Sequence, residues 1–227
     1  MISIENLIVS YTKGCKIIDS LNLSLREGLI HGIVGLNGAG KTTLLNTIYG
    51  LKKQDGGNVY FNGKKLNKRN VSYLVTENFF YSNITAREYL SLFKNTNFKT
   101  EKWNELFNLP LDQIVDGYST GMKKKLAILG SLKQEKPVMI LDEPFNGLDI
   151  ETCRIIRSIL LRLKEKGRTI IVTSHIIETL TNLCDHIHYL ENGNINQSCD
   201  KNGFKEFEDE IFKEIEIKNE KLISELI

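Results

Sequence analysis

The sequence of 227 residues lacks the features that mark several specialised classes of protein. No run of 18 apolar residues occurs, so we expect that the chain does not cross a bilayer by itself. The first residues show no basic region followed by an apolar stretch, which argues against a signal peptide. Internal repeats and low-complexity stretches are absent as well. Any role at a membrane would therefore be exercised through a partner.

The cysteine content and the net charge exclude further classes. The four cysteines are scattered without metal-ligand spacing, which fits reduced thiols in a cytosolic protein better than a disulfide framework. A formal net charge of +2 is too small to indicate a nucleic acid partner, and the basic run at residues 123–125 is expected to be a solvated face. The length and the 41% hydrophobic content allow one large α/β domain, or a domain with a small inserted lobe.

A phosphate-binding loop is the most informative segment of the chain. Residues 35–43 read Gly-Leu-Asn-Gly-Ala-Gly-Lys-Thr-Thr and fit the pattern G-x-x-x-x-G-K-[ST]. An apolar stretch at residues 29–34 predicts a buried strand before the loop, and a helical pattern follows it up to Gly50. In this order of elements, backbone N–H groups and a helix N-terminus can surround a triphosphate. Lys41 would reach the terminal phosphates, and Thr42 would offer its hydroxyl to Mg²⁺. The residues expected to contact the nucleotide are Gly35, Leu36, Asn37, Gly38, Ala39, Gly40, Lys41, Thr42 and Thr43.

Two later apolar stretches predict further strands, at residues 138–141 and 169–173. Apolar strands separated by helices indicate a parallel sheet covered on both faces, whose ligands bind beyond the carboxyl ends of the strands. Asp142 and Glu143 follow the first of these strands, and His175 follows the second, so we expect all three beside the phosphate loop. Adjacent acids at a strand end point in different directions, so one can hold a Mg²⁺-bound water while the other faces the γ-phosphate.

The rest of the chain predicts three additions to this core. Short apolar strips in the first sixty residues, and a turn at Asn62-Gly63, indicate a small antiparallel sheet. A helical pattern from residue 85 to residue 107 indicates a helical lobe, inserted at about residues 78–135. In the tail at residues 200–227, Phe204, Phe207, Ile211 and Ile215 suit one helical face, whereas residues 215–217 alternate like a strand. The pattern leaves open whether the tail packs on the core or contributes to a dimer contact. His31 is expected to be structural, and His186 and His188 receive no role.

In its ordered motifs the chain resembles the nucleotide-binding domain of an ATP-binding cassette (ABC) transporter. The resemblance runs from about residue 2 to residue 195 and implies that residues 1–199 form the domain. It also implies a P-loop NTPase core with a mainly parallel sheet, an N-terminal antiparallel β subdomain and an inserted α-helical subdomain. The matching segments are Walker A at 35–43, the signature motif at 118–122, Walker B with its glutamate at 138–143, the D-loop at 146–149 and the switch histidine at 173–175.

The resemblance assigns a role to each candidate residue. Residues 37–43 would hold the phosphates of ATP, and Tyr11 would stack on adenine. Thr42 and Asp142 would position Mg²⁺. Glu143 would act as general base on the attacking water, and His175 would contact the γ-phosphate, with Lys41 completing the catalytic group. Ser119 and Gly121 would close over ATP held by a second copy, since cassettes of this family dimerise head to tail. Separate transmembrane permease subunits would be the other partners, which places the chain on the cytoplasmic face of the cell membrane.

Two segments depart from the family pattern. Where the family usually has a glutamine that touches Mg²⁺ and the transmembrane subunit, this chain has Thr76 or Glu77, depending on a one-residue choice of register. A glutamate there could still ligate Mg²⁺, and Glu77 is therefore included as a candidate metal ligand. The signature has Thr120 in place of its first glycine and Met122 in place of glutamine. This variant resembles cassettes of bacterial exporters whose membrane subunits are separately encoded, which favours export.

Two other functions compete with the ATPase subunit of a transporter. A soluble ABC ATPase of translation or DNA maintenance usually carries two cassettes, or a long coiled coil that splits the cassette, and this chain has neither. A small-molecule kinase or a GTPase would also use a phosphate-binding loop, but it would need neither the segment at residues 118–122 nor His175. The transported substrate leaves no trace, because cassettes do not bind it.

Overall fold

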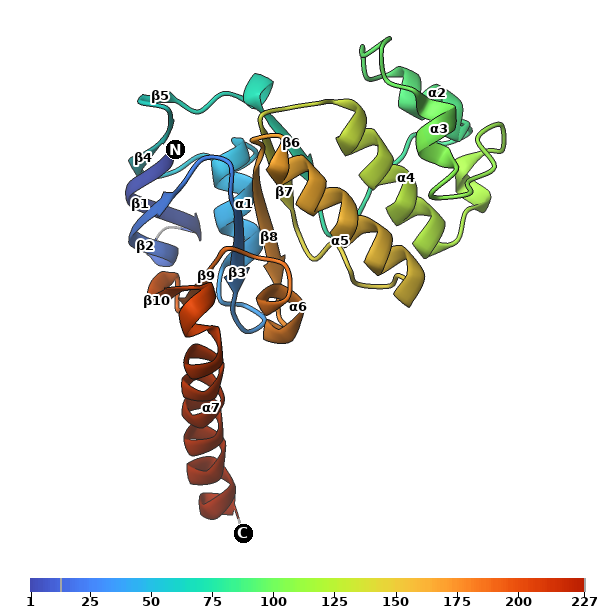
Figure 1. Cartoon of the computed structure of the whole chain (residues 1–227). Coiled ribbons are helices and arrows are strands. Elements are labelled where there is room, and N and C mark those ends of the chain that lie inside the picture. Colours follow the sequence, from blue (N-terminus) through green and yellow to red (C-terminus); the bar gives the residue numbers. More distant parts are fainter. Residues whose placement is uncertain (13, 227) are drawn as a thin grey trace.

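A computed structural model describes the backbone of residues 1–12 and 14–226. Within the last helix it does not describe the side chains of residues 214, 215, 218, 219, 221, 222, 225 and 226. Figure 1 shows a central sheet between a small N-terminal sheet on one side and a helical lobe on the other, with a long C-terminal helix leading away from the body.

The central sheet has six strands in the order β10-β9-β3-β8-β7-β6. All neighbours pair in parallel except β9 and β10, which are antiparallel, so the predicted mainly parallel core is confirmed. Every residue of β3, β7 and β8 is buried, which explains their continuous apolar sequences. The strands are β3 (Ile30–Val34), β6 (Val71–Leu74), β7 (Val138–Leu141), β8 (Thr169–Ser174), β9 (His186–Glu191) and β10 (Asn194–Asp200).

Each face of the central sheet is covered by its own apolar layer. Ile33, Ile140 and Ile171 pack with α1 (Lys41–Tyr49) and the N-terminal sheet. Alternate residues such as Leu141 and Val172 point to the other face, which is covered by residues of α4 (Thr120–Lys133), α5 (Ile150–Glu165) and α6 (Ile177–Thr181). Helix α5 begins at the side-chain cap of Asp149 and is followed by Gly167 at φ 79°.

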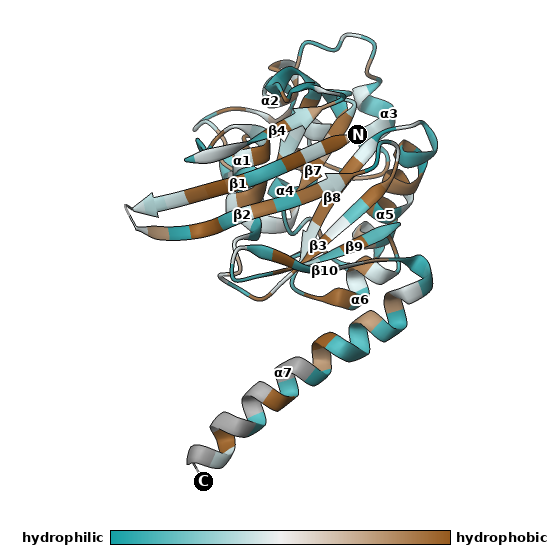
Figure 2. Cartoon of the chain, turned by 90° about the vertical axis from the view of Figure 1, so that its left-hand side faces the viewer, coloured by the Kyte–Doolittle hydropathy of each residue, from teal (hydrophilic) through white to brown (hydrophobic). Residues whose placement is uncertain are grey.

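The N-terminal sheet has the order β2-β1-β4-β5 and is antiparallel throughout, as predicted. Figure 2 shows apolar and polar residues alternating along β1 and β2, the pattern of a sheet with one buried face. Its strands are β1 (Ile2–Thr12), β2 (Cys15–Leu25), β4 (Gly56–Phe61) and β5 (Lys64–Lys65).

The helical lobe contains two short helices before α4, and not one helical stretch from residue 85 to residue 107. Helix α2 (Ala86–Ser91) starts at a capping box between Thr85 and Glu88, and α3 (Thr100–Asn104) follows after a turn. Asn95 lies in that turn, where its amide donates to the carbonyl of Lys133 over 3.1 Å. Asparagine favours such turns, and this contact fixes the chain reversal on the end of α4. Short 3-10 turns occur at Lys68–Asn70, Val115–Gly117 and Lys201–Gly203.

The C-terminal tail is a helix, α7 (Phe204–Leu226), so the strand-like alternation at residues 215–217 does not form a strand. Phe204, Phe207 and Ile211 are buried in the same core as α5 and α6, whereas Ile217 is 67% exposed. The side chain of Ile215, also expected on the buried face, lies outside the described residues. Among the described residues, neither α7 nor any shorter helix combines the length and apolar character needed to span a bilayer.

Three of the four histidines stack across β3 and β9. The rings of His31 and His188 have centroids 5.4 Å apart, and those of His31 and His186 lie 5.5 Å apart. His31 Nδ1 is 3.2 Å from His188 Nε2, and His188 Nδ1 is 2.8 Å from the hydroxyl of Ser198. Burial lowers the pKa of His31 to about 4 and that of His188 to about 3. His31 is therefore a neutral residue of the core, in line with its expected structural role.

The burial of the start of α7 predicts different effects for two residues of one helix. Phe207→Ala removes a ring that is 3% exposed and should lower the free energy of unfolding by about 3 kcal/mol. Ile217→Ala should change it by less than about 0.5 kcal/mol, because this side chain is mostly exposed. Urea unfolding of both variants measures the difference, and equal losses would contradict the packing of α7 on the core.

The histidine stack predicts that stability falls in mild acid. In the unfolded chain these histidines bind protons below about pH 6.5, whereas the folded chain leaves His31 and His188 neutral to much lower pH. Their full contribution is present at pH 7 and is lost as the pH falls from 6.5 toward 4, by about 1 kcal/mol per pH unit for each residue. Urea unfolding between pH 7 and pH 5 should show a shallower slope for His188→Gln, and an unchanged slope would contradict this origin.

Candidate functional site

The phosphate loop joins β3 to α1 with a backbone that requires glycine. Gly38 and Gly40 have φ values of 85° and 106°, in the left-handed region that other residues avoid. A Cβ added to Gly35 would lie 2.3 Å from the carbonyl oxygen of Leu190 on β9, so only glycine lets the loop start this close to the sheet. Helix α1 begins at Lys41 without a side-chain cap. Its first N–H groups are thus left to a ligand, and an anion such as a phosphate suits them.

Lys41 lies folded back over this loop. Its ammonium donates to the carbonyl oxygens of Gly35 at 2.6 Å and of Leu36 at 3.3 Å. It also lies 3.8 Å from Glu143 Oε1. Burial lowers the pKa of Lys41, and the nearby carboxylates of Glu143 and Asp142 oppose that shift. The ammonium group of Lys41 therefore lies where the loop, the end of β7 and the start of α1 meet.

Asp142 is completely buried and accepts hydrogen bonds from three hydroxyl groups. Thr42 of α1 and Thr76, which follows β6, both donate to Oδ2 at 2.8 Å, and Thr173 of β8 donates to Oδ1 at 2.6 Å. A carboxylate beside hydroxyl groups is the hard oxygen donor set that Mg²⁺ prefers. The residues present therefore fit a magnesium ion bound between Asp142 and Thr42.

Glu143 is oriented by contacts to both its backbone and its carboxylate. Its φ of 49° is left-handed, its N–H donates to Thr173 Oγ1 at 2.9 Å, and its carbonyl accepts from the ammonium of Lys124 at 2.7 Å. Both carboxylate oxygens lie 3.1 Å from His175 Nδ1, and Asn146 Nδ2 donates to Oε2 at 3.3 Å. The arrangement leaves a carboxylate that can accept a proton beside the phosphate loop.

A cavity of about 500 Å³ brings most of the predicted residues together. Tyr11 lines it although its side chain is 60% exposed, and the Lys52 ammonium lies 4.4 Å from the centre of its ring. Ile17 also lines it, and neither Ile17 nor Lys52 follows from any motif. The predicted residues at the cavity are Tyr11, Leu36, Asn37, Gly38, Gly40, Lys41, Thr42, Thr43, Asp142, Glu143 and His175; Gly35 and Ala39 support the loop from outside its lining.

The structure separates the two candidates for the position usually held by glutamine. Both residues are exposed, but Thr76 lines the cavity and donates to Asp142, whereas Glu77 does not line the cavity. The contact with Asp142 favours Thr76 over Glu77 for this position. The preference follows from the end of β6 at Leu74, which the sequence pattern leaves uncertain by one residue.

Ser119 and Gly121 lie at the start of α4 and do not line the cavity of their own chain. The Ser119 hydroxyl caps α4 by accepting from the N–H of Met122 at 3.3 Å. The carbonyl of Gly147 in the D-loop would lie 3.5 Å from a Cβ placed on Gly121. The signature and the D-loop therefore adjoin each other, and the role of the signature at the ATP of a second copy stays a prediction.

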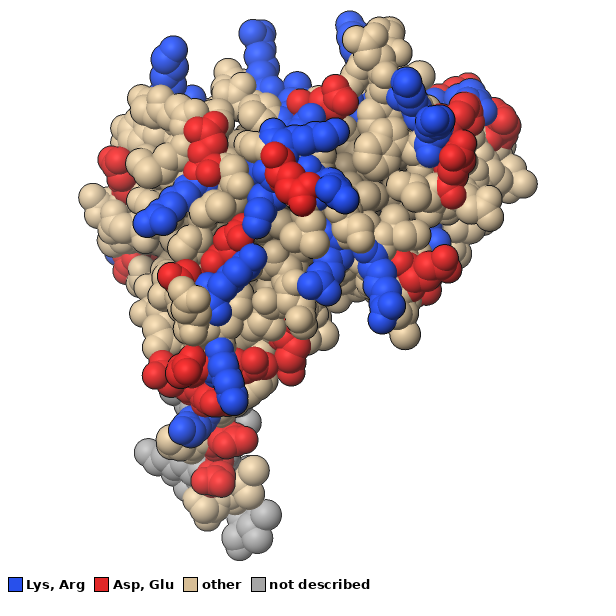
Figure 3. All heavy atoms as spheres, in the orientation of Figure 1, with Lys and Arg blue, Asp and Glu red and all other residues tan. Residues whose placement is uncertain are grey.

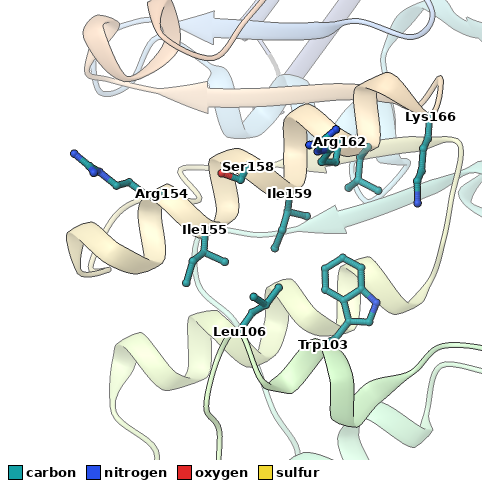
Figure 4. Close-up of a pocket in the computed structure, with 9 residues that line it drawn as sticks. Trp103, Leu106, Arg154, Ile155, Ser158, Ile159, Arg162 and Lys166 are labelled. Atoms are coloured by element: carbon teal, nitrogen blue, oxygen red, sulfur yellow. The ribbon is translucent and has the colours of Figure 1, made fainter.

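A second hollow, of about 400 Å³, lies between the lobe and the core and contains none of the predicted site residues. Figure 4 shows Trp103 and Leu106 facing Ile155 and Ile159 of α5, with Lys166 at one end. In Figure 3 basic and acidic side chains are interspersed over the face of the molecule that is in view. The cavity at the phosphate loop thus gathers the polar groups of the candidate site, whereas aromatic and aliphatic side chains form most of this second hollow.

Comparisons with known proteins agree with this geometry. The family model described as ABC transporter matches residues 18–146. An uncharacterised ABC transporter ATP-binding protein of Methanocaldococcus jannaschii is 33% identical over 202 residues, which cover 85% of this chain and 74% of that protein. The lantibiotic transport ATP-binding protein SrtF of Streptococcus pyogenes is 30% identical over 204 residues, which cover 86% of this chain and 89% of that protein.

A solved structure described as a dimeric bacterial ABC transporter cassette has a TM-score of 0.80 and 25% identity, and the match covers 88% of this chain and 99% of that one. The two chains therefore share a fold, and the fold class that the resemblance implies is confirmed for this chain. Together with its ordered motifs and their assembly around one cavity, these matches show that the chain belongs to the ABC transporter family as an ATP-binding cassette.

Proposed function

We propose that this chain is the ATP-hydrolysing subunit of an ABC transporter and powers transport, in the direction of export, by separate transmembrane subunits. The observation that carries the proposal is the Glu143 carboxylate, 3.1 Å from His175 and 3.8 Å from the Lys41 ammonium of the phosphate loop. A base next to a phosphate cradle is what hydrolysis of a terminal phosphate requires. The family match and the transport proteins among the relatives favour this function over a soluble ABC ATPase of translation or DNA maintenance.

In this proposal ATP lies in the cavity with its phosphates on the N–H groups of residues 37–43 and on Lys41. Tyr11, at the rim, stacks on adenine. Thr42 and Asp142 hold Mg²⁺, with Thr76 beside them in place of Glu77. When bound, Mg²⁺ would offset the negative charge of the phosphate oxygens.

Glu143 takes the proton from the attacking water, because its carboxylate is the one acidic group of the described cavity that is not enclosed by hydroxyl donors. His175 Nδ1 lies 3.1 Å from that carboxylate, so Nε2 is the nitrogen left for the γ-phosphate, and donation from both nitrogens at once requires the imidazolium form. His175 thus orients the base and contacts the reacting phosphate at the same time. Asn146 donates to Oε2 of Glu143 and so limits the rotation of the carboxylate.

The site is completed by a second copy of the chain. Ser119 and Gly121 stand at the N-terminus of α4, where backbone N–H groups suit a phosphate, yet they do not line their own cavity. In a head-to-tail dimer each copy brings this terminus to the ATP of the other. The dimeric state of the similar solved cassette supports this arrangement.

The membrane subunits dock on the segment between β6 and α2. Phe79 is 87% exposed and Tyr81 is 67% exposed, which are unusual values for aromatic side chains. Both residues follow Thr76 within five positions, and Thr76 donates to the Asp142 carboxylate. A partner bound to these aromatic side chains would therefore lie near the nucleotide site. Such a contact could carry the state of the nucleotide to the membrane. The chain itself would then sit peripherally on the cytoplasmic face.

The role of Glu143 predicts the behaviour of Glu143→Gln. The amide cannot take a proton from water, so turnover should fall by about 100-fold or more while ATP binding is kept. The variant should accumulate as an ATP-bound dimer, which size-exclusion chromatography with ATP detects. Glu105→Gln, at an exposed position of the helical lobe, is the matched control. Normal hydrolysis by Glu143→Gln would refute the assignment of the base.

The docking segment predicts a separation of assembly from catalysis. The double change of Phe79→Ala and Tyr81→Ala should abolish copurification with the membrane subunits, because it removes the exposed aromatic surface. ATP hydrolysis by the isolated cassette should stay within about twofold, because neither residue lines the cavity. Leu106→Ala, an exposed apolar residue of the other hollow, is the control for assembly. Retained copurification of the double variant would place the docking surface elsewhere.

A further inference from the structure

Lys124 is the buried member of a lysine run that was expected to be a solvated face. Its side chain is 5% exposed, whereas the neighbouring Lys123 and Lys125 are only partly buried. It lies on the face of α4 that is turned toward the end of β7, where its ammonium donates to the carbonyl oxygen of Glu143 at 2.7 Å. The expectation fails for this residue because the pattern of charges does not reveal which face of α4 covers the sheet.

A buried ammonium is costly unless it is compensated, and here the compensation comes from the site itself. Asp142 and Glu143 are the acidic groups that act on Lys124, and the hydrogen bond to the Glu143 carbonyl is charge-assisted. Lys123, by contrast, donates to the carbonyl of Asp116 at 3.4 Å, away from the site. Two adjacent lysines of one helix therefore differ in that one of them contacts the peptide unit of the proposed base.

The backbone of Glu143 needs such a contact. A φ of 49° is unfavourable for a residue with a Cβ by about 1 kcal/mol, and it persists only where the surroundings enforce it. Thr173 Oγ1 holds the N–H of Glu143, and Lys124 holds its carbonyl. The two bonds restrain both ends of the residue, and with them the direction in which the carboxylate leaves the backbone.

The same helix also carries the signature residue. Ser119 caps α4, and Lys124 lies five residues further on, about 7.5 Å along the helix axis. A rigid helix therefore connects the surface that would meet the ATP of a second copy with the base that would act on the ATP of its own chain.

We propose that Lys124 is a positioning residue for Glu143, which ties the alignment of the general base to the position of α4. This inference rests on the proposed function. It adds a route between the two sites of a dimer: when Ser119 contacts the nucleotide of a second copy, α4 and Lys124 transmit that contact to the Glu143 of their own chain. Lys124 acts through a hydrogen bond to the backbone and does not touch ATP.

The test compares Lys124→Met with Lys123→Met in the full chain. Lys124→Met keeps the length of the side chain but removes the donor, so kcat should fall by about tenfold or more, since small misalignments of a catalytic group are costly. The KM for ATP and the affinity for a slowly hydrolysed ATP analogue should stay within about twofold. Lys123→Met should leave both parameters unchanged. An unchanged kcat for Lys124→Met, or equal losses in kcat and analogue affinity, would overturn the proposal.

A double-mutant cycle with Glu143→Gln separates positioning from a general structural role. If Lys124 acts through the carboxylate, Lys124→Met should have no further effect on the residual single-turnover rate of Glu143→Gln. A further loss by the same factor as in the wild-type background would overturn the proposal. Normal turnover by Glu143→Gln alone would instead overturn the assignment of the base, so the two failures are distinguishable. If Lys124→Met does not fold, Lys124→Leu, which also lacks a donor, takes its place with the same outcomes.

Discussion

The hydrogen bonds to the buried carboxylate of Asp142 are the interactions on which the rest of the site depends. Three threonine hydroxyls converge on it from α1, from the segment after β6 and from β8. An unpartnered carboxylate without exposure to water would be strongly destabilising, so these elements must be in place before the site is stable. The same bonds bring the phosphate loop, the docking segment and the strand that leads to His175 into register. The segments proposed for ATP binding, for docking and for catalysis are thus all bonded to one carboxylate.

The local parts of this arrangement could be predicted from sequence, because each is set by a short pattern. Residues 35–43 carry their own backbone requirements, and the apolar stretches at β7 and β8 place Asp142 and His175 at the same edge of the sheet. These features depend on neighbours in the chain, and one sequence is enough to read them.

Other features depend on neighbours in space, and there the sequence was insufficient. The choice between Thr76 and Glu77 depends on where β6 ends, which is decided by its pairing with β7. The burial of Lys124 depends on which face of α4 meets the sheet. The helical pattern after Thr85 breaks into α2 and α3 because the turn at Asn95 is fastened to α4.

The hairpin between β9 and β10 has a consequence for where the functional unit ends. Its turn glycine, Gly193, donates its N–H to the carbonyl of Ala39 in the phosphate loop and lies so close to β2 that a Cβ would be 2.1 Å from the Ile17 carbonyl. The carbonyl oxygen of Leu190 on β9 would likewise lie 2.3 Å from a Cβ on Gly35. The nucleotide cradle is thus a composite of two stretches separated by some 150 residues of chain. A fragment that ends after His175 would keep every motif, but it would lack the β9–β10 hairpin that supports the phosphate-binding loop.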